Sequence, residues 1–159
     1  MQAIVNIERL NRFINEYRAE HKAQSIVFTN GCFDILHRGH VQYLEMAKAK
    51  GDLLVVGLNS DESVRRLKGL ERPYIKAEDR AYILSRLEAV DVVSVFEEDT
   101  PLKIIENVQP DVLVKGSDYE IDEIVGRDVV VHRGGQVITI PLVKGRSTSA
   151  ILQKIKLNK

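Results

Sequence analysis

The fold is decided at residues 29–40, which run Thr29-Asn30-Gly31-Cys32-Phe33-Asp34-Ile35-Leu36-His37-Arg38-Gly39-His40. The apolar residues 26–28 just before this stretch predict a short buried strand. The apolar spacing over residues 41–47 just after it predicts a helix. The stretch therefore joins the end of a strand to the start of a helix.

Two histidines occupy this junction. Because His37 and His40 are three residues apart, they can share one face of a helix. A helix start adds free N–H groups and a partial positive charge, which suit a phosphate, and Gly39 lets a ligand approach the backbone. A single histidine here would more often be a cap or a filler. However, two of the four histidines of the chain lie in this turn, so we predict chemistry on a phosphate.

Strand and helix patterns alternate along the chain, which predicts a parallel sheet with crossover helices. Short, nearly continuous apolar runs indicate strands that are covered on both faces. The strands are predicted at 25–29, 53–58, 92–96, 112–114 and 137–140, and the helices at 7–20, 39–50, 60–68, 78–87, 101–108 and from near Ser147. The expected fold is a Rossmann-like three-layer α/β fold with a mainly parallel five-stranded sheet.

The chain length favours a single domain over residues 1–159. Within it, an amphipathic helix in residues 1–24 is expected to pack on the sheet, although its apolar stripe could equally serve a homodimer. Thr100 is expected to cap the helix that begins with Pro101. Residues 116–127 are polar and acidic, and they predict a surface loop with a short helical turn.

Composition excludes several classes of protein. The 23 basic and 23 acidic residues balance, which argues against a nucleic-acid partner held by bulk charge. The apolar runs are far shorter than a membrane span, and the start of the chain lacks a signal-peptide pattern. The single cysteine excludes an internal disulfide and suits a reducing cytoplasm. We expect no metal site built from protein ligands alone.

A second anion site is predicted at residues 145–149, Gly145-Arg146-Ser147-Thr148-Ser149. Ser147 or Thr148 could simply cap the last helix. With Arg146 beside them, the same turn offers hydroxyls, N–H groups and a guanidinium to a phosphate. Neither the Rossmann Gly-x-Gly-x-x-Gly pattern nor the P-loop spacing occurs in the chain.

The pattern Gly-x-Phe-Asp-x-x-His-x-Gly-His, over residues 31–40, resembles the signature of the cytidylyltransferase-like nucleotidyltransferases. Further segments resemble one branch, the D-glycero-D-manno-heptose 1-phosphate adenylyltransferases, which are free-standing or form the C-terminal half of a bifunctional heptose kinase/adenylyltransferase. These segments are 28–34, 59–61, 64–69, 72–73, 78–80, 110–116 and 145–148. The resemblance covers nearly the whole chain, roughly residues 6–155.

The resemblance implies transfer of AMP from ATP to a heptose 1-phosphate, with release of pyrophosphate and with Mg²⁺ accompanying ATP. The kinase step of the same pathway would need a separate heptose kinase, and the product would serve lipopolysaccharide or another surface glycan. The implied catalytic residues are His37, His40, Lys68 and Arg146. The implied nucleotide-binding residues are Cys32, Phe33, Asp34, Gly39, Gly116, Asp118, Ser147 and Thr148. The implied substrate-binding residues are Asn30, Lys68, Arg72, Arg80, Lys115 and Tyr119.

Several alternatives stay open. Asp34 could hold its own turn through backbone N–H groups instead of touching a ligand, and Cys32 could be a small filler. Arg80 could pair with a neighbouring carboxylate. The whole protein could instead be a glycerol-3-phosphate-type cytidylyltransferase, or a module that binds nucleotide without turnover. Those cytidylyltransferases carry an arginine four residues before the Gly-x-Ser-Thr turn, whereas this chain has Pro141-Leu142-Val143 in that region and carries its arginine as Arg146. This departure weakens the first of these two alternatives.

Overall fold

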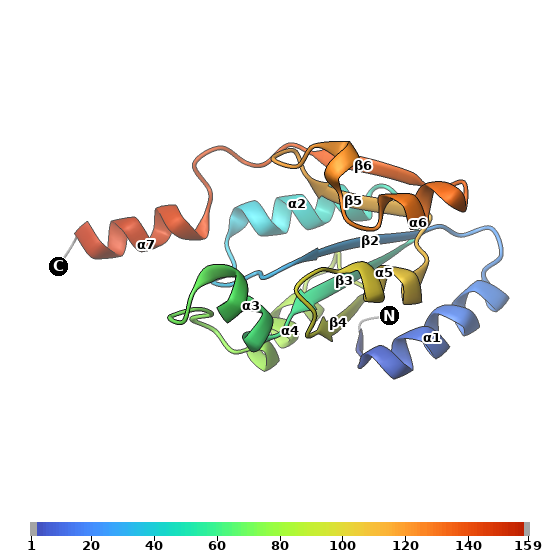
Figure 1. Cartoon of the computed structure of the whole chain (residues 1–159), viewed down its shortest axis with the longest axis horizontal. Helices are drawn as coiled ribbons and strands as arrows, with labels where there is room; N and C mark the ends of the chain where they lie inside the picture. The colour runs from blue at the N-terminus through green and yellow to red at the C-terminus, as the bar shows by residue number, and fades with distance from the viewer. Residues whose placement is uncertain (1–2, 158–159) are drawn as a thin grey trace.

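The computed structural model describes residues 3–157 as one α/β/α sandwich (Figure 1). Its sheet consists of six parallel strands in the order β1-β4-β3-β2-β5-β6. The strands are β1 (Ala3–Ile4), β2 (Ile26–Gly31), β3 (Leu53–Asn59), β4 (Val92–Phe96), β5 (Val112–Gly116) and β6 (Gln136–Ile140). The helices are α1 (Ile7–Glu20), α2 (Arg38–Lys48), α3 (Asp61–Lys68), α4 (Ala77–Ser85), α5 (Leu102–Val108), α6 (Arg127–His132) and α7 (Thr148–Leu157), with a 3₁₀ turn, η1 (Ile121–Glu123).

The Rossmann-like parallel fold is confirmed, with one strand more than the five predicted. The additional strand, β1, has two residues and pairs with the outer edge of β4. A strand this short has no detectable period in a sequence. The six-residue helix α6 is also additional, whereas the short turn expected in the 116–127 loop is present as η1. Helix α5 begins one residue later than predicted, because Pro101 has ψ near 10° and takes the cap position itself.

Successive residues of a strand point to opposite faces of the sheet, so they contribute to two separate apolar cores. In β2, Val27 faces a core shared with α2 and α4, whereas Ile26 and Phe28 face a core shared with α1, α5 and α6. All three side chains are fully buried. This explains the continuous apolar runs in the sequence, since a strand covered on both faces has no polar side.

Helix α1 covers its own sheet. Asn6 caps it by accepting a hydrogen bond from the Arg9 N–H at 2.9 Å, and Leu10 and Ile14 are buried against α5 and β4. At its far end Arg18 forms a 3.2 Å ion pair with Asp111. The apolar stripe of α1 is therefore used within the chain.

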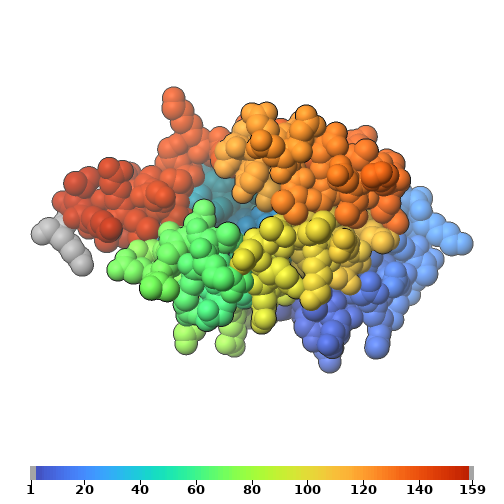
Figure 2. All heavy atoms as spheres, in the orientation of Figure 1, coloured from blue at the N-terminus to red at the C-terminus, as the bar shows by residue number. Residues whose placement is uncertain are grey.

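The order of strands reverses between β2 and β5. The chain runs from β2 outward through β3 to β4, and then returns to the other side of β2 for β5 and β6. The loops that follow β2 and β5 consequently part, and this leaves a crevice at the carboxyl ends of the strands. In Figure 2 a hollow opens on this part of the surface, between the green, orange and red segments.

Helix α7 extends away from the sheet at one end of the molecule (Figure 1), and none of its residues is fully buried. Within residues 3–157, no helix combines the length and the apolar character that a membrane crossing requires.

Candidate active site

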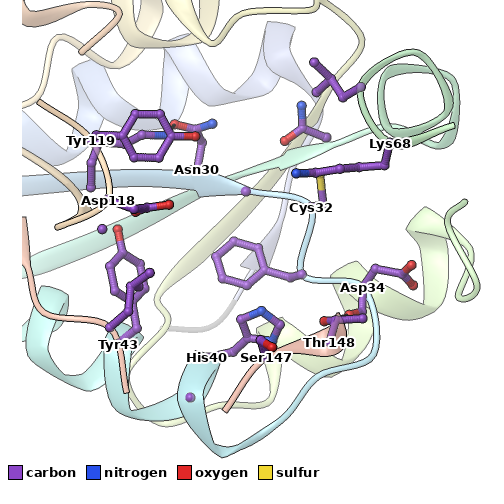
Figure 3. Close-up of a pocket in the computed structure, with 18 of the residues that line it drawn as sticks. Asn30, Cys32, Asp34, His40, Tyr43, Lys68, Asp118, Tyr119, Ser147 and Thr148 are labelled. Carbon is purple, nitrogen blue, oxygen red and sulfur yellow. Dashed lines mark hydrogen bonds between the residues drawn. The ribbon is translucent and has the colours of Figure 1, made fainter. Parts of the chain in front are cut away.

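The crevice holds a pocket of about 590 Å³, a size typical of small-molecule sites. Its lining comes from the loops after β2, β3, β4 and β5 and from the turn before α7 (Figure 3). All of the predicted site residues except Arg80 line it. They are Asn30, Cys32, Phe33, Asp34, His37, Gly39, His40, Lys68, Arg72, Lys115, Gly116, Asp118, Tyr119, Arg146, Ser147 and Thr148.

The turn between β2 and α2 has a constrained backbone. Phe33 and Ile35 adopt left-handed conformations, with φ of 45° and 56°, which side-chain-bearing residues rarely do. The turn ends at His37, whose Nδ1 accepts a 3.1 Å hydrogen bond from the Gly39 N–H and so caps α2. This path brings the rings of His37 and His40 face to face, with centroids 3.8 Å apart and planes inclined by 22°.

Burial keeps both imidazoles neutral. Desolvation, helped by the neighbouring His37, lowers the pKa of His40 to about 4, and desolvation also lowers the pKa of His37. Among the described residues, the buried Nδ1 atom of His40 has no hydrogen-bond partner. A neutral imidazole offers one N–H donor, and it gains a second when an incoming anion favours protonation. The pair therefore suits a ligand that brings negative charge.

The turn before α7 packs directly on the start of α2. A Cβ added to Gly39 would lie 2.9 Å from the backbone oxygen of Arg146, so only glycine allows this approach. The Ser147 hydroxyl accepts a 3.1 Å hydrogen bond from the Ala150 N–H, as a cap does. The Thr148 hydroxyl donates to the backbone oxygen of Asp34 at 2.7 Å. Two helix N-termini thus face the same pocket.

Asp34 ties this histidine turn to the loop between α3 and α4. Its carboxylate is 1% exposed and accepts hydrogen bonds from Arg72 Nε at 2.7 Å, Tyr74 N at 2.9 Å and Ile75 N at 3.0 Å. Burial alone would raise the pKa of Asp34, but these donors hold it below its usual range. The arrangement places Arg72 at the rim of the pocket.

The structure does not bring Arg80 into the pocket. Its guanidinium is 1% exposed and forms an ion pair of 2.7 Å with Asp61. It also donates to the backbone oxygens of Cys32, Asn59 and Ile75 at 2.6, 2.9 and 2.8 Å. Arg80 therefore holds together the segments that follow β2 and β3.

The basic end of α3 divides into two kinds of residue. Arg65 pairs with Glu62, and Arg66 pairs with Asp99, so both guanidinium groups have acidic partners, and neither arginine lines the pocket. Lys68, in contrast, lines the pocket and points toward Cys32 (Figure 3). Burial raises the pKa of the Cys32 thiol, so this cysteine is kept as a thiol and not as a thiolate.

The opposite side of the pocket is built at the end of β5. Lys115 is 9% exposed and donates a 3.0 Å hydrogen bond to Asn30 Oδ1, at the end of β2. Its ammonium lies 4.5 Å from the centre of the Tyr119 ring. Gly116 permits Asp118 to fold back, since a Cβ there would lie 2.5 Å from a carboxylate oxygen of Asp118.

Sequence reasoning missed part of the lining. Tyr43 lies one helical turn after His40, a spacing that could have revealed it, and its hydroxyl is 2.7 Å from the Thr29 hydroxyl. Asn59 ends β3, and the end of a strand in a parallel sheet is a position that could have revealed it. The remaining missed residues are Gly31, Leu67, Asp99, Thr100, Pro101, Glu123, Val125, Leu142 and Val143. Most of them lie in loops that have no motif of their own.

A doubly wound α/β sheet with paired histidines and two helix N-termini at its switch point defines a class of phosphate-binding proteins that act on nucleotides or related small molecules. Within this class, residues 28–154 match the cytidylyltransferase-like family. The chain belongs to that family. The match includes every predicted site residue, from Asn30 to Thr148.

Similar proteins agree with this assignment. The chain is 55% identical to the bifunctional protein HldE of Citrifermentans bemidjiense over 150 residues, which are 94% of this chain and 31% of that protein. It is 54% identical to the bifunctional protein HldE of Geobacter sulfurreducens over 152 residues, 96% of this chain and 31% of that protein. The chain thus spans about a third of the length of these relatives.

Solved structures resemble it as well. The lipopolysaccharide core biosynthesis protein from Thermoplasma volcanium is 30% identical, with a TM-score of 0.63, and the match covers 77% of this chain and 98% of that one. The pantoate-beta-alanine ligase from Francisella tularensis, with a TM-score of 0.61 and 17% identity, shares the fold alone; that match covers 94% of this chain and 69% of that one.

Proposed function

We propose that this protein transfers the adenylyl group of ATP to D-glycero-D-manno-heptose 1-phosphate, giving ADP-heptose and pyrophosphate. The observation that carries the proposal is the extended similarity to bifunctional HldE proteins, at 55% identity over 94% of the chain. The pocket supports it, because the segments that resemble heptose 1-phosphate adenylyltransferases supply most of its polar lining.

The reaction needs positioning more than acid–base chemistry. An oxygen of the sugar phosphate forms a bond to the α-phosphorus of ATP, and the bond from that phosphorus to the bridging oxygen of the β-phosphate breaks. Pyrophosphate leaves with the electron pair. Since the second pKa of a phosphate monoester is near 6, the attacking group is mostly a dianion at pH 7 and needs no general base. The site must hold two polyanions in line and stabilise the charge that develops.

Each group of pocket residues would contact a different part of the two substrates. His37 and His40 would donate hydrogen bonds to the transferring phosphoryl group and the leaving pyrophosphate. Arg146, the Ser147 and Thr148 hydroxyls and the start of α7 would bind the remaining phosphates, as charge-assisted donors do. Asp118 would contact the sugar or the base of the nucleotide. Lys68 and Arg72, which also line the pocket, would meet the sugar phosphate.

We further propose that Mg²⁺ enters with ATP. Among residues 3–157 there is no group of three or more His, Cys, Asp or Glu side chains able to hold a metal ion. The donor set here consists mainly of N–H groups, hydroxyls and cations, which suits phosphate better than a metal. When bound, the ion would neutralise triphosphate oxygens, which together with water supply the ligands that Mg²⁺ prefers. The setting we propose is the cytoplasm, where ATP is available and a heptose kinase could supply the substrate.

Release of pyrophosphate tests the proposal. The purified chain is given ATP or CTP together with heptose 1-phosphate in each anomeric form, glycerol 3-phosphate or no acceptor, and the nucleotide-sugar is identified by mass spectrometry. We expect rapid pyrophosphate release only with ATP and heptose 1-phosphate. Preference for CTP with glycerol 3-phosphate would identify a cytidylyltransferase instead. Binding of ATP without turnover of any acceptor would identify a nucleotide-binding module.

A further inference from the structure

Lys115 is a buried cation at the point where the order of the strands reverses. It is the last residue but one of β5, and its Nζ atom donates a hydrogen bond to Asn30 Oδ1 at the end of β2, 3.0 Å away. On its other side the ring of Tyr119 lies 4.5 Å from the ammonium (Figure 3 shows Tyr119 beside Asn30). These two contacts fix the direction of a side chain that is otherwise flexible.

The ammonium keeps unused hydrogen-bonding capacity. A lysine has three N–H donors, and among residues 3–157 this one makes a single hydrogen bond and no ion pair. The side chain nevertheless lines the pocket and is 9% exposed. Burying a charge without a partner is costly, so a partner that arrives with negative charge is bound strongly.

The electrostatics agree with this geometry. Burial lowers the pKa of Lys115 to about 8, although the negative charges of Asp118 and, when ionised, Cys32 act in the opposite direction. Burial also raises the pKa of Tyr119, and Tyr43 beside it has its pKa raised to about 12, so both phenols stay neutral. Asp118 is the carboxylate whose charge acts on the ammonium, and among the described residues the two form no ion pair.

We propose that the Lys115 ammonium, oriented by Asn30 and Tyr119, is a second phosphate-binding point of the pocket, separate from the histidine turn and the start of α7. The proposal rests on the proposed function, because adenylyl transfer brings two phosphorylated molecules into one pocket. The donors around His37 and Arg146 gather at one wall. Lys115 stands at another, on β5. Its ligand is a phosphate oxygen, carried by either the nucleotide or the sugar phosphate.

Replacing Lys115 by Met removes the charge and keeps the apolar stem. Titration calorimetry of wild type and K115M would use α,β-methylene-ATP and heptose 1-phosphate, each beside its unphosphorylated counterpart, adenosine or free heptose. We expect K115M to weaken binding of a phosphorylated ligand by about 10- to 100-fold, the range for a hydrogen bond to a charged group. Binding of adenosine and heptose should stay within about 2-fold. The phosphorylated ligand that loses affinity identifies the source of the phosphate oxygen.

Exposed Lys22 offers a matched control, since K22M removes the same charge far from the pocket. A second variant, K115R, keeps its charge at alkaline pH. In wild type the dissociation constant of the affected ligand should rise as the pH passes 8, because the ammonium loses its proton. In K115R this rise should disappear.

Two results would overturn the second phosphate-binding point. One is equal affinity of wild type and K115M for every phosphorylated ligand that wild type binds. The other is an equal loss for phosphorylated and unphosphorylated ligands, which would indicate a collapsed pocket. If wild type fails to bind heptose 1-phosphate at all, the proposed acceptor is wrong, while the α,β-methylene-ATP titration still decides the role of Lys115.

Discussion

His37 and His40 illustrate how a ligand-free site can be prepared for negative charge. Their rings stack at a centroid distance of 3.8 Å. This contact is favourable only while both rings are neutral, because two imidazolium ions would repel each other. Phe33 adds an edge-on contact to His40 at 5.3 Å and withdraws it further from water. A bound triphosphate shifts the protonation equilibrium of the histidines the other way, because its negative charge favours the imidazolium form. The same burial that keeps the free site neutral therefore makes the histidines responsive to the ligand.

This burial has a consequence for stability. In the folded chain the pKa of His40 is about 4, against 6.5 for an unperturbed histidine. Between these values the unfolded chain binds a proton that the folded chain does not, so the free energy of unfolding falls as the pH drops from 6.5 to 4. The loss amounts to at most about 3 kcal/mol, and His37 acts in the same direction. Urea denaturation at pH 7 and pH 4.5 would measure it.

The variant His40→Gln provides the comparison, because it removes the titrating group and keeps a polar side chain. Its stability should change less between the two pH values than that of wild type. The Asp34–Arg72 ion pair does not confuse the result, since the pKa of Asp34 lies below its usual range and the pair persists through this window. An identical pH dependence in both proteins would contradict the neutral state of His40.

The histidines also permit a kinetic prediction. If they stabilise the transferring phosphoryl group, His37→Ala and His40→Ala should each lower kcat by about 100-fold or more, the usual cost of a lost donor at a developing negative charge. Circular dichroism should show that both variants fold. Near-normal turnover in either variant would remove that histidine from the proposed mechanism, and loss of folding would show that it serves the core instead.

Residues differ in how far sequence alone could assign them. The histidine pair was predictable because its members are three residues apart in one turn. The position of Arg80 was not, because its partners Cys32 and Asn59 lie 48 and 21 residues away and only the folded sheet brings them together. Asp34 is intermediate. Hydrogen bonds from backbone N–H groups to its carboxylate were one of the two expectations, but the donors come from the loop at 72–75 and not from its own turn.

The start of α7 joins two parts of the pocket that are more than 100 residues apart. Thr148 donates to the Asp34 backbone, and the Arg146 backbone lies over Gly39. Since α7 has no fully buried residue, its first turn is its main attachment to the sheet. The start of α7 was predicted near Ser147, and the helix begins at Thr148. The two-residue strand β1 and the six-residue helix α6 were not predicted, because they are too short to show a pattern, whereas the long apolar runs of β3 and β4 were found almost to the residue.

This attachment predicts two separable effects. Ser147→Ala removes a helix cap and should cost about 1 kcal/mol of stability. If the turn also binds phosphate, Ser147→Ala and Thr148→Ala should in addition weaken triphosphate binding or slow turnover, and Arg146→Ala should do so more strongly. Thermal denaturation and steady-state kinetics of the three variants would separate the two roles. Unchanged kinetics in all three would leave the turn as a cap alone.

Across the molecule, the pocket depends on the reversal of strand order between β2 and β5. Two sets of loops diverge at this point. One set follows β2, β3 and β4, and the other follows β5 and precedes α7; each set contributes polar side chains to the pocket. The first set carries Lys68 and Arg72, and the second carries Lys115, Asp118 and Tyr119. Under the proposed function, the two ligands would enter this pocket of about 590 Å³ from opposite sides and meet at the histidines.

A pocket of this composition should discriminate strongly between acceptors. The heptose ring presents several hydroxyls beside its phosphate, and a site that hydrogen-bonds them leaves buried polar groups unpaired when a smaller acceptor binds. Such sites can reject the smaller molecule by about 10⁴-fold. We therefore expect kcat/KM with ATP to be higher for heptose 1-phosphate than for glycerol 3-phosphate by a factor of that order, measured in direct competition. Glycerol 3-phosphate is small and flexible, so it would fill the phosphate contacts and leave the rest of the pocket to water. Comparable kcat/KM values for the two acceptors would mean that the pocket recognises only the phosphate, and that the choice of heptose is made elsewhere.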